Sequence, residues 1–196
     1  MEKSDETLMG EYQEGSSDAL EELFGRYKAK VFNFAYRILS DRAEAEDATS
    51  DLFLTLLSKS GAYSARPLAK FSTWAYTVVR NGCLSRLRKR RGWLSFSQEQ
   101  DPQGEGELVE WQVADAGPGP GEQAQRKDLG QWVQAAVKQL PLSQKEAIVL
   151  REYHGLSYAE IAQVLGCSME NVKILIFRAR EALRKELAPL LKEGDA

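Results

Sequence analysis

The stretch Leu156–Glu181, LSYAEIAQVLGCSMENVKILIFRARE, decides the fold of the C-terminal part of the chain. Ser157 and Glu160 have the spacing of a capping box, and Ser168 is a second N-cap residue, so a helix is expected to begin at each serine. A three-residue turn containing Gly166 separates the two expected helices. Two helices joined by so tight a turn have helix-turn-helix spacing.

Apolar residues give each of these helices one face for a core. The expected core positions are Ala159, Ile161, Ala162 and Leu165 in the first helix and Val172, Ile176, Ala179 and Leu183 in the second. An ordinary helical hairpin has the same periodicity, so the pattern alone leaves that alternative open. Cations on the second helix favour DNA binding, because they are suited to phosphates. They are Lys173, Arg178, Arg180, Arg184 and Lys185.

The residues before this stretch also predict helices. One apolar stripe ends at Pro141 and comprises Leu129, Trp132, Val133, Ala136, Val137 and Leu140. Ser143 and Glu146 have capping-box spacing, so another helix is expected to begin at Ser143. This block is therefore expected to hold four short helices.

The N-terminal block is helical by the same criterion. A first stripe consists of Leu20, Leu23, Phe24, Tyr27, Val31, Phe34, Ala35 and Ile38. Asp41, with Glu44, begins a second helix whose stripe is Ala45, Ala48, Leu52, Phe53 and Leu56. After a predicted loop at 58–70, a third helix from about Ser72 to Gly92 turns inward Trp74, Ala75, Val78 and Val79. No stretch alternates as a strand does, so the predicted fold class is all-α.

Charge divides the chain into three parts. Residues 1–91 hold 15 Lys+Arg and 13 Asp+Glu, residues 126–196 hold 11 and 9, and residues 92–125 hold no base and seven acids, so that +2, +2 and −7 sum to the net −3. The acidic part has six Gly and three Pro, a composition typical of a flexible linker. We therefore expect two small helical domains, 1–92 and 126–196, joined by a flexible acidic linker, 93–125. Its aromatic residues, Trp93, Phe96 and Trp111, fit either packing on a domain or docking into a partner.

Several classes of site are not expected. Cys83, Cys167 and the single histidine, His154, do not supply the roughly four ligands of a zinc site, and we predict no metal, cofactor or catalytic residue. The polar, acidic N-terminus has no apolar segment of a signal peptide, and no run reaches the roughly 18 apolar residues of a membrane span. The expected location is the cytoplasm.

Residues 80–91, RNGCLSRLRKRR, hold six bases and no acid. Bases near a helix end are commonly a solvated C-terminus. Here aromatic residues precede the run, namely Tyr63, Phe71, Trp74 and Tyr76. Aromatic faces beside a cationic track are typical of sites for unstacked bases. Phe71 and Trp74 fit a place in the core equally well.

The segment DRAEAEDATSD, 41–51, places Glu44, Asp47 and Asp51 on one helix face opposite its apolar stripe. An exposed face offers no pocket that would tune carboxylates for acid–base catalysis. The face is either simply solvated or a docking surface for a basic protein partner.

Three segments in order resemble conserved regions 2 and 4 of extracytoplasmic-function sigma factors of the sigma-70 family. They are LFGRYKAKVFNFAYRILSDRAEAEDATSDLFLTLL (23–57), FSTWAYTVVRNGCLSRLRKRR (71–91) and LPLSQKEAIVLREYHGLSYAEIAQVLGCSMENVKILIFRAREAL (140–183). The resemblance covers nearly the whole chain. It implies a promoter-specificity subunit that binds core RNA polymerase on the clamp of its largest subunit, recognises promoter DNA, and is usually held inactive by an anti-sigma factor.

The resemblance also implies a role for particular residues. Core docking would use Glu44, Asp47, Asp51 and Phe53, although the family often has Gln-Glu where this chain has Ser50-Asp51. Asn81 matches an asparagine that helps to hold a flipped-out base of the −10 element. With it, the expected −10 contacts are Tyr63, Phe71, Trp74, Tyr76, Arg80, Arg86, Arg88, Lys89 and Arg90. The expected −35 contacts are Ser168, Glu170, Asn171, Lys173, Ile174, Arg178 and Arg180.

Ile174 and Leu175 depart from the family, which often has Ser and Arg at these positions. At roughly 100° per residue, Ile174 lies opposite the core stripe and Leu175 on its flank. In a major groove Ile174 would contact thymine methyl groups. The alternative is that an anti-sigma factor covers it.

Two other classes of function remain as alternatives. A stand-alone helix-turn-helix regulator would use residues 1–91 for sensing or dimerisation and would not bind core polymerase. A DNA recombinase would need a nucleophile with a base, or a metal-binding carboxylate cluster, in a pocket.

Overall fold

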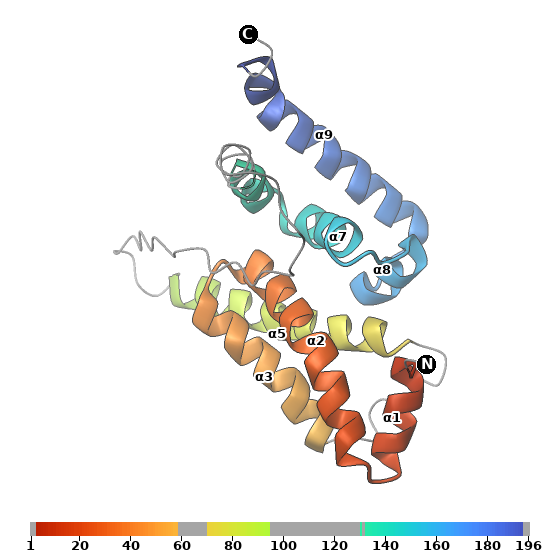
Figure 1. Cartoon of the computed structure of the whole chain (residues 1–196). Helices are drawn as coiled ribbons and strands as arrows, with labels where there is room; N and C mark the ends of the chain where they lie inside the picture. Colours follow the sequence, from red (N-terminus) through yellow and green to blue (C-terminus); the bar gives the residue numbers. More distant parts are fainter. Residues whose placement is uncertain (1–2, 59–69, 95–129, 131, 194–196) are drawn as a thin grey trace, which may run out of the picture. The chain divides into compact units, whose positions relative to one another are not determined.

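The computed structural model describes residues 3–58, 70–94, 130 and 132–193, and all the regular structure in them is helical (Figure 1). The prediction of an all-α fold is confirmed for these residues. The chain forms two compact units, one N-terminal and one C-terminal. The predicted linker lies outside the described residues apart from its first two, which are helical. The domain limits 1–92 and 126–196 therefore stay a prediction, as does the role of Phe96 and Trp111.

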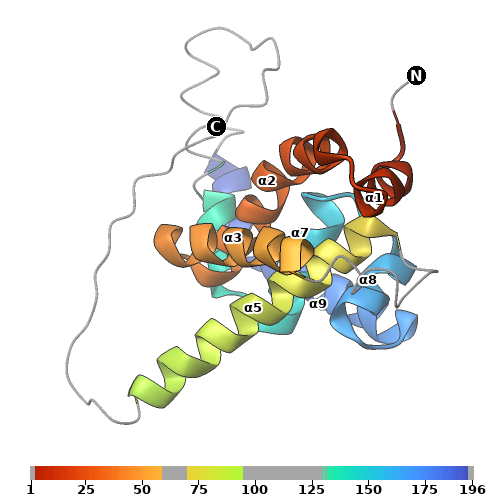
Figure 2. The same ribbon diagram turned by 90° about the horizontal axis from the view of Figure 1, so that it is seen from below.

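The first unit is built from α1 (Asp5–Gln13), α2 (Ser17–Leu39), α3 (Arg42–Ser58) and α5 (Phe71–Leu94). The helices α2, α3 and α5 pack on one another, and α1 packs on α2 and on α5 (Figures 1 and 2). Their core consists of the predicted stripes of α2 and α3 with few exceptions. Leu23, Tyr27, Val31, Phe34, Ala35 and Ile38 are buried in α2, and all five predicted positions are buried in α3.

Two predicted core positions of α2 are wrong. Phe24 is exposed and Leu20 is half-buried, whereas Ala19 and Leu39, which the stripe did not include, are buried. The third helix runs from Phe71 to Leu94, so Gly92 does not end it. A glycine inside a helix weakens it by only about 1 kcal/mol, which the neighbouring turns offset. In this helix Trp74, Ala75 and Val79 are buried as predicted, and Val78 is half-buried.

The segment 58–70 was predicted as a loop, and 59–69 lies outside the described residues. The N-cap of α3 is confirmed, because the backbone N–H of Glu44 donates to the side chain of Asp41 at 2.9 Å. In a full capping box the carboxylate of Glu44 would also accept from the backbone N–H of Asp41. Here this carboxylate binds Arg90 of α5 instead.

Helix α1 is an element that the sequence pattern did not predict. The side chain of Ser4 caps it by accepting from the backbone N–H of Thr7 at 3.1 Å, and Leu8 and Met9 are buried beneath it. Two apolar residues are too few to show a helical period, which is why the pattern missed this helix.

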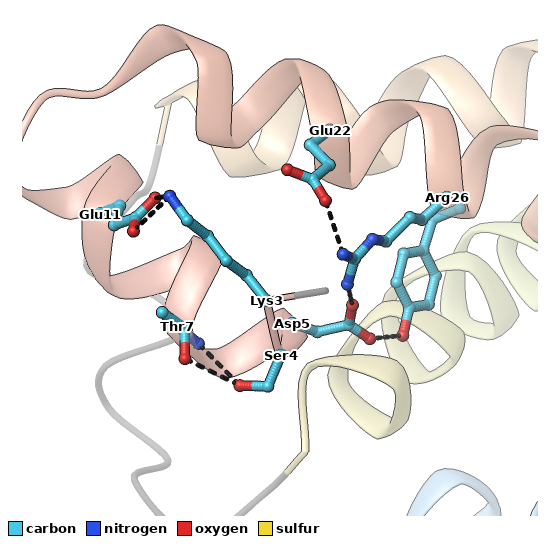
Figure 3. Close-up of polar contacts among 8 residues, drawn as sticks. Lys3, Ser4, Asp5, Thr7, Glu11, Glu22 and Arg26 are labelled. Carbon is cyan, nitrogen blue, oxygen red and sulfur yellow. Dashed lines mark hydrogen bonds and ion pairs between the residues drawn. The ribbon is translucent and has the colours of Figure 1, made fainter. Parts of the chain in front are cut away.

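A polar network fixes α1 to α2. The carboxylate of Asp5 accepts from the guanidinium of Arg26 at 2.7 Å and also from the hydroxyl of Tyr27 (Figure 3). Burial, followed by the contact with Asp5, raises the pKa of Tyr27 above its ordinary value. One carboxylate of α1 thus satisfies two donors of α2.

Helix α1 also reaches α5. The carboxylate of Glu6 accepts from the backbone N–H of Phe71, the first residue of α5, at 3.3 Å. The first N–H groups of a helix have no partner inside it. Glu6 therefore caps α5 from a distant part of the chain.

The C-terminal part of the chain contains a helical segment at 132–139, followed by α7 (Leu142–Glu152), α8 (Tyr158–Leu165) and α9 (Met169–Glu193). Ala136, Val137 and Leu140 are buried as predicted, but Trp132 is exposed and Val133 is only half-buried. The segment is joined to α7 by Lys145, whose ammonium group donates to the carbonyl of Lys138 at 2.7 Å.

Two predictions about the helix limits in this part of the chain are wrong. Helix α7 begins at Leu142 after Pro141, so Ser143 is a helical residue and not the N-cap. Proline fixes its own φ and suits the boundary of a helix, and here it places the N-cap two residues earlier than predicted. Glu146, the expected partner of Ser143, is buried. Helix α9 has 25 residues and is not short.

Loss of the Asp5 carboxylate is expected to detach α1. Asp5→Ala leaves the hydroxyl of buried Tyr27 without this acceptor, which costs about 1–3 kcal/mol. Amide exchange in α1 should accelerate roughly 5- to 140-fold, since every 1.4 kcal/mol is about tenfold. Glu21→Ala is the matched control, because Glu21 is exposed on α2 and pairs with no cation in the described part of the chain. Equal exchange in both variants would show that Asp5 does not hold α1.

Candidate nucleic-acid and partner-binding surfaces

Helices α8 and α9 form the predicted helix-turn-helix. The hydroxyl of Ser157 accepts from the backbone N–H of Glu160 at 3.3 Å, and the carboxylate of Glu160 accepts from the backbone N–H of Ser157 at 2.8 Å. This reciprocal pair confirms the capping box that begins α8. The hydroxyl of Ser168 accepts from the backbone N–H of Asn171 at 3.2 Å and so begins α9.

The turn between the helices depends on Gly166, which has φ +68°. This left-handed conformation is easily adopted by glycine and is uncommon for residues that carry a Cβ. The backbone N–H of Cys167 then donates to the carbonyl of Ala162 at 3.1 Å and closes the turn. The turn between α8 and α9 is therefore held by one left-handed glycine and one backbone hydrogen bond.

The core side of this motif differs in detail from the prediction. Ile161, Val172, Ile176 and Ala179 are buried as expected. Ala162, Leu165 and Leu183 are half-buried, Ala159 is exposed, and Val164 takes a core position that was not predicted. The first turn of α8 is turned further outward than its apolar residues suggested.

The opposite side of α9 faces solvent. Ile174 is 47% exposed, which confirms its outward direction, and Leu175 on the flank is half-buried. Phe177, one turn further along, is 65% exposed and was not predicted. Its spacing of three from Ile174 is the sequence signal that would have placed it beside Ile174 on the helix surface. Two large apolar side chains therefore share the outer face of the second helix.

Polar residues surround these two side chains. Those predicted to contact DNA are all exposed: Ser168, Glu170, Asn171, Lys173, Arg178 and Arg180. Lys173 and Arg178 form no ion pair in the described part of the chain. Arg180 differs, because its guanidinium binds the carboxylate of Glu152 in α7 at 2.6 Å, and this hydrogen bond raises the pKa of Arg180. The charge of Arg180 is therefore already partly neutralised by Glu152.

The basic residues of α5 form two groups. Arg88 and Lys89 are exposed, as is Asn81, whereas Arg80 is half-buried. Arg86 donates to the carboxylate of Asp51 in α3 at 2.8 Å. Arg90 binds Glu44 through two nitrogens, each at 2.9 Å, and its guanidinium also lies 3.3 Å from Asp41.

The aromatic residues predicted to form a platform on α5 lie in the core of the free protein. Phe71 is fully buried, with Tyr27 edge-on at a centroid distance of 4.9 Å, and Tyr76 packs edge-on against Phe34 at 5.6 Å. Trp74 is also buried. Burial raises the pKa of Tyr76 above its ordinary value. These rings complete the helical core, and a fully buried ring has no face for a base.

Tyr63, the remaining aromatic residue of that prediction, lies outside the described residues. The side chain of Trp93 lies outside them as well.

The acidic helix α3 presents a mixed surface. Asp47 and Asp51 are exposed as predicted, and Glu44 is half-buried under Arg90. Phe53 is buried, with its ring 4.5 Å from that of Phe24, so it supports the surface from beneath.

Leu54 and Leu57, which were not predicted to take part, are exposed on the same helix. Their positions follow Asp47 and Asp51 at helical spacing of three and four. Apolar and acidic side chains therefore lie together on α3.

Within the described residues there is no group of three metal-ligating side chains, and no described helix is long and apolar enough to cross a membrane. The geometry defines a helical DNA-binding protein. It has a helix-turn-helix in one unit and a basic helix beside an acidic one in the other.

Comparison with known proteins agrees with this class. The family model for sigma-70 region 2 matches residues 23–92, and the model for sigma-70 region 4 matches residues 130–183. The chain is 32% identical over 195 residues to the RNA polymerase sigma-H factor of Pseudomonas aeruginosa, covering 98% of each. It is 30% identical over 178 residues to the ECF RNA polymerase sigma factor SigW of Bacillus subtilis, covering 91% of this chain and 94% of SigW.

Solved structures share the fold. The sigma factor RpoE of Bartonella quintana, in complex with the anti-sigma factor NepR, aligns with a TM-score of 0.67 and 22% identity over 86% of this chain and 96% of that one. CnrH, in complex with the cytosolic domain of CnrY, aligns with a TM-score of 0.64 and 21% identity over 99% and 100%.

The chain belongs to the sigma-70 family, in its extracytoplasmic-function group. It is a promoter-specificity subunit of RNA polymerase.

The stability of the helix-turn-helix should depend on the hydroxyl of Ser157 and not on that of Ser143. Ser157→Ala removes the cap of α8 and is expected to destabilise α8 and α9 by about 1 kcal/mol. Ser143→Ala is the matched control, since this serine is exposed inside the first turn of α7. Amide exchange in α8 during a urea titration measures the difference. Equal destabilisation by both variants would contradict the assignment of the caps.

Proposed function

We propose that the two units of this chain divide the promoter between them, with α5 acting at the −10 element and α9 at the −35 element. The observation that supports this proposal is the outward face of α9. There Lys173 and Arg178 lie beside exposed Ile174 on the second helix of a helix-turn-helix. In such motifs the second helix enters the major groove.

In this proposal α9 reads duplex DNA. Glu170, Asn171 and Lys173 approach base edges, and Arg178 binds phosphate. Ile174 contacts thymine methyl groups. Ser168 acts through the cap that it forms, and Arg180 contributes less than the other cations because Glu152 holds it.

At the −10 element α5 contributes polar contacts. Asn81 is exposed and holds an extruded base, while Arg88 and Lys89 bind backbone phosphates. Arg80, which precedes Asn81 in α5, is half-buried. Since Phe71, Trp74 and Tyr76 are buried, the base-stacking role assigned to them is not part of the proposal.

The mixed surface of α3 is proposed to dock on the clamp of the largest polymerase subunit. Asp47 and Asp51 offer charge, and Leu54 and Leu57 offer apolar area to be buried. A partner with basic and apolar side chains complements this combination. Phe53 holds the surface from beneath.

We further propose that an anti-sigma factor controls the protein. Of the two solved structures of this fold, RpoE is bound to the anti-sigma factor NepR, and CnrH is bound to the cytosolic domain of CnrY. The place of action is the cytoplasm, where bacterial RNA polymerase works. The chain is proposed to have no catalytic activity of its own. A stand-alone regulator would share α8 and α9 but would not need the surface of α3.

Transcription in vitro tests the proposal directly. Core polymerase with this protein should start transcription at promoters that core alone ignores, as shown by run-off assays and start-site mapping on a genomic library. Asp47→Asn should weaken core binding, because it removes one charge from the docking surface of α3. DNA binding without any binding to core polymerase would instead favour the stand-alone regulator.

The apolar contact of Ile174 has its own test. Replacing thymine by deoxyuridine in the −35 element removes methyl groups, each worth about 0.8 kcal/mol when buried, or roughly fourfold in affinity. The affinity of the holoenzyme for the promoter should fall by this factor. The affinity of holoenzyme that carries Ile174→Ser should not change on the replacement. Ile174→Val keeps an apolar contact and serves as the control. An unchanged response in Ile174→Ser would show that Ile174 does not contact the methyl groups and would favour the alternative that an anti-sigma factor covers it.

A further inference from the structure

Two arginines of α5 and two acids of α3 belong to different predicted surfaces, yet the fold pairs them. Arg86 and Arg90 were expected to bind promoter DNA, and Asp51 and Glu44 to bind polymerase. The distances between the paired groups are 2.8 and 2.9 Å. In the free protein these groups therefore satisfy one another.

The pairing follows from how the helices run. Arg86 and Arg90 are one turn apart on α5, with a rise of about 6 Å. Their partners on α3 come in the reverse order, Asp51 and then Glu44, so the two helices run antiparallel along this contact. Arg90 also donates to the carbonyl of Leu39 at the end of α2, and its guanidinium lies 3.3 Å from the carboxylate of Asp41, which precedes α3.

The pairs are weak enough to exchange. The side chains of Arg86 and Asp51 are 20% and 57% exposed, and those of Arg90 and Glu44 are 39% and 28% exposed. Ion pairs with this much solvent contact contribute little to stability. A DNA phosphate presents to arginine the same bidentate oxygen geometry as a carboxylate, and releases counterions when bound.

We propose that Asp51 and Glu44 act as internal substitutes for DNA phosphates, holding Arg86 and Arg90 until a basic partner binds the acids of α3. The released arginines then bind the DNA backbone beside Arg88 and Lys89. Those two are exposed and form no ion pair in the described part of the chain.

The partner that takes the acids is core polymerase, and this step rests on the function proposed above. Coupling of this kind is reciprocal, so DNA raises the affinity for the partner by the same factor. The free protein thereby binds DNA about three- to tenfold more weakly than it would with the arginines released.

The salt dependence of DNA binding tests the pairing without polymerase. The variant Glu44→Gln/Asp51→Asn keeps the size and polarity of both side chains and removes their charges. With a single-stranded oligonucleotide, affinity should rise about three- to tenfold. The slope of log affinity against log salt should steepen by about 0.7 to 1.4, since each newly bound phosphate adds roughly 0.7.

A second double variant removes the same charge elsewhere. Glu14→Gln/Glu21→Gln changes two exposed carboxylates that pair with no cation in the described part of the chain. An equal gain in both variants would reduce the effect to net charge and overturn the proposal. A gain that persists when Arg86 and Arg90 are also changed to glutamine would overturn it as well.

The role of polymerase is tested separately, by measuring the affinity for core polymerase. The variant Glu44→Gln/Asp51→Asn should bind core polymerase more weakly while it binds free DNA more tightly. Tighter DNA binding with unchanged core binding would place the acids outside the polymerase interface and overturn the second half of the proposal. Failure of the whole protein to bind polymerase would reject the proposed function but leave the salt result standing.

Discussion

The packing of α5 against α2 and α3 is the constraint on which the first unit depends. One side of α5 is apolar, and its fully buried residues Phe71, Ala75 and Cys83 seal the core. The other side carries the charges. Because a helix fixes both sides at once, the burial of the aromatic rings determines which basic groups remain at the surface. The packing of the apolar side of α5 therefore also determines the position of its charged side.

Sequence periodicity predicted the helices well where the apolar stripe was long. In α2 the repeat continues for about five turns, and its centre is buried as expected. Residue type was ambiguous where core and contact roles use the same side chains. Phe53 was expected in the core stripe and also at the docking surface, and Tyr76 among the DNA contacts, and both are buried. A large ring gains more by burial than by exposure. Trp132 shows the reverse, since it was expected inside and is exposed.

Charged contacts between helices could not be predicted from the sequence. Capping boxes are local, so Ser157 and Ser168 were found from spacing alone. The contacts of Arg86 and Arg90 join residues 35 and 46 positions apart, and no local pattern encodes them. Phe177 was missed for a different reason. It was expected neither in the core nor among the DNA contacts, although its spacing from Ile174 was visible.

The cap that Glu6 supplies to Phe71 joins residues 65 positions apart. During synthesis α1 leaves the ribosome long before α5 exists. At roughly 5–20 residues per second, Glu6 waits about 3–13 s for the amide that it caps. Helices α2 and α3 have time to pair in that interval, because their contact is local in the chain. Helix α1 can likewise settle on α2, through Asp5, before α5 exists. The first unit is therefore expected to close last around α5, when the backbone amide of Phe71 meets Glu6.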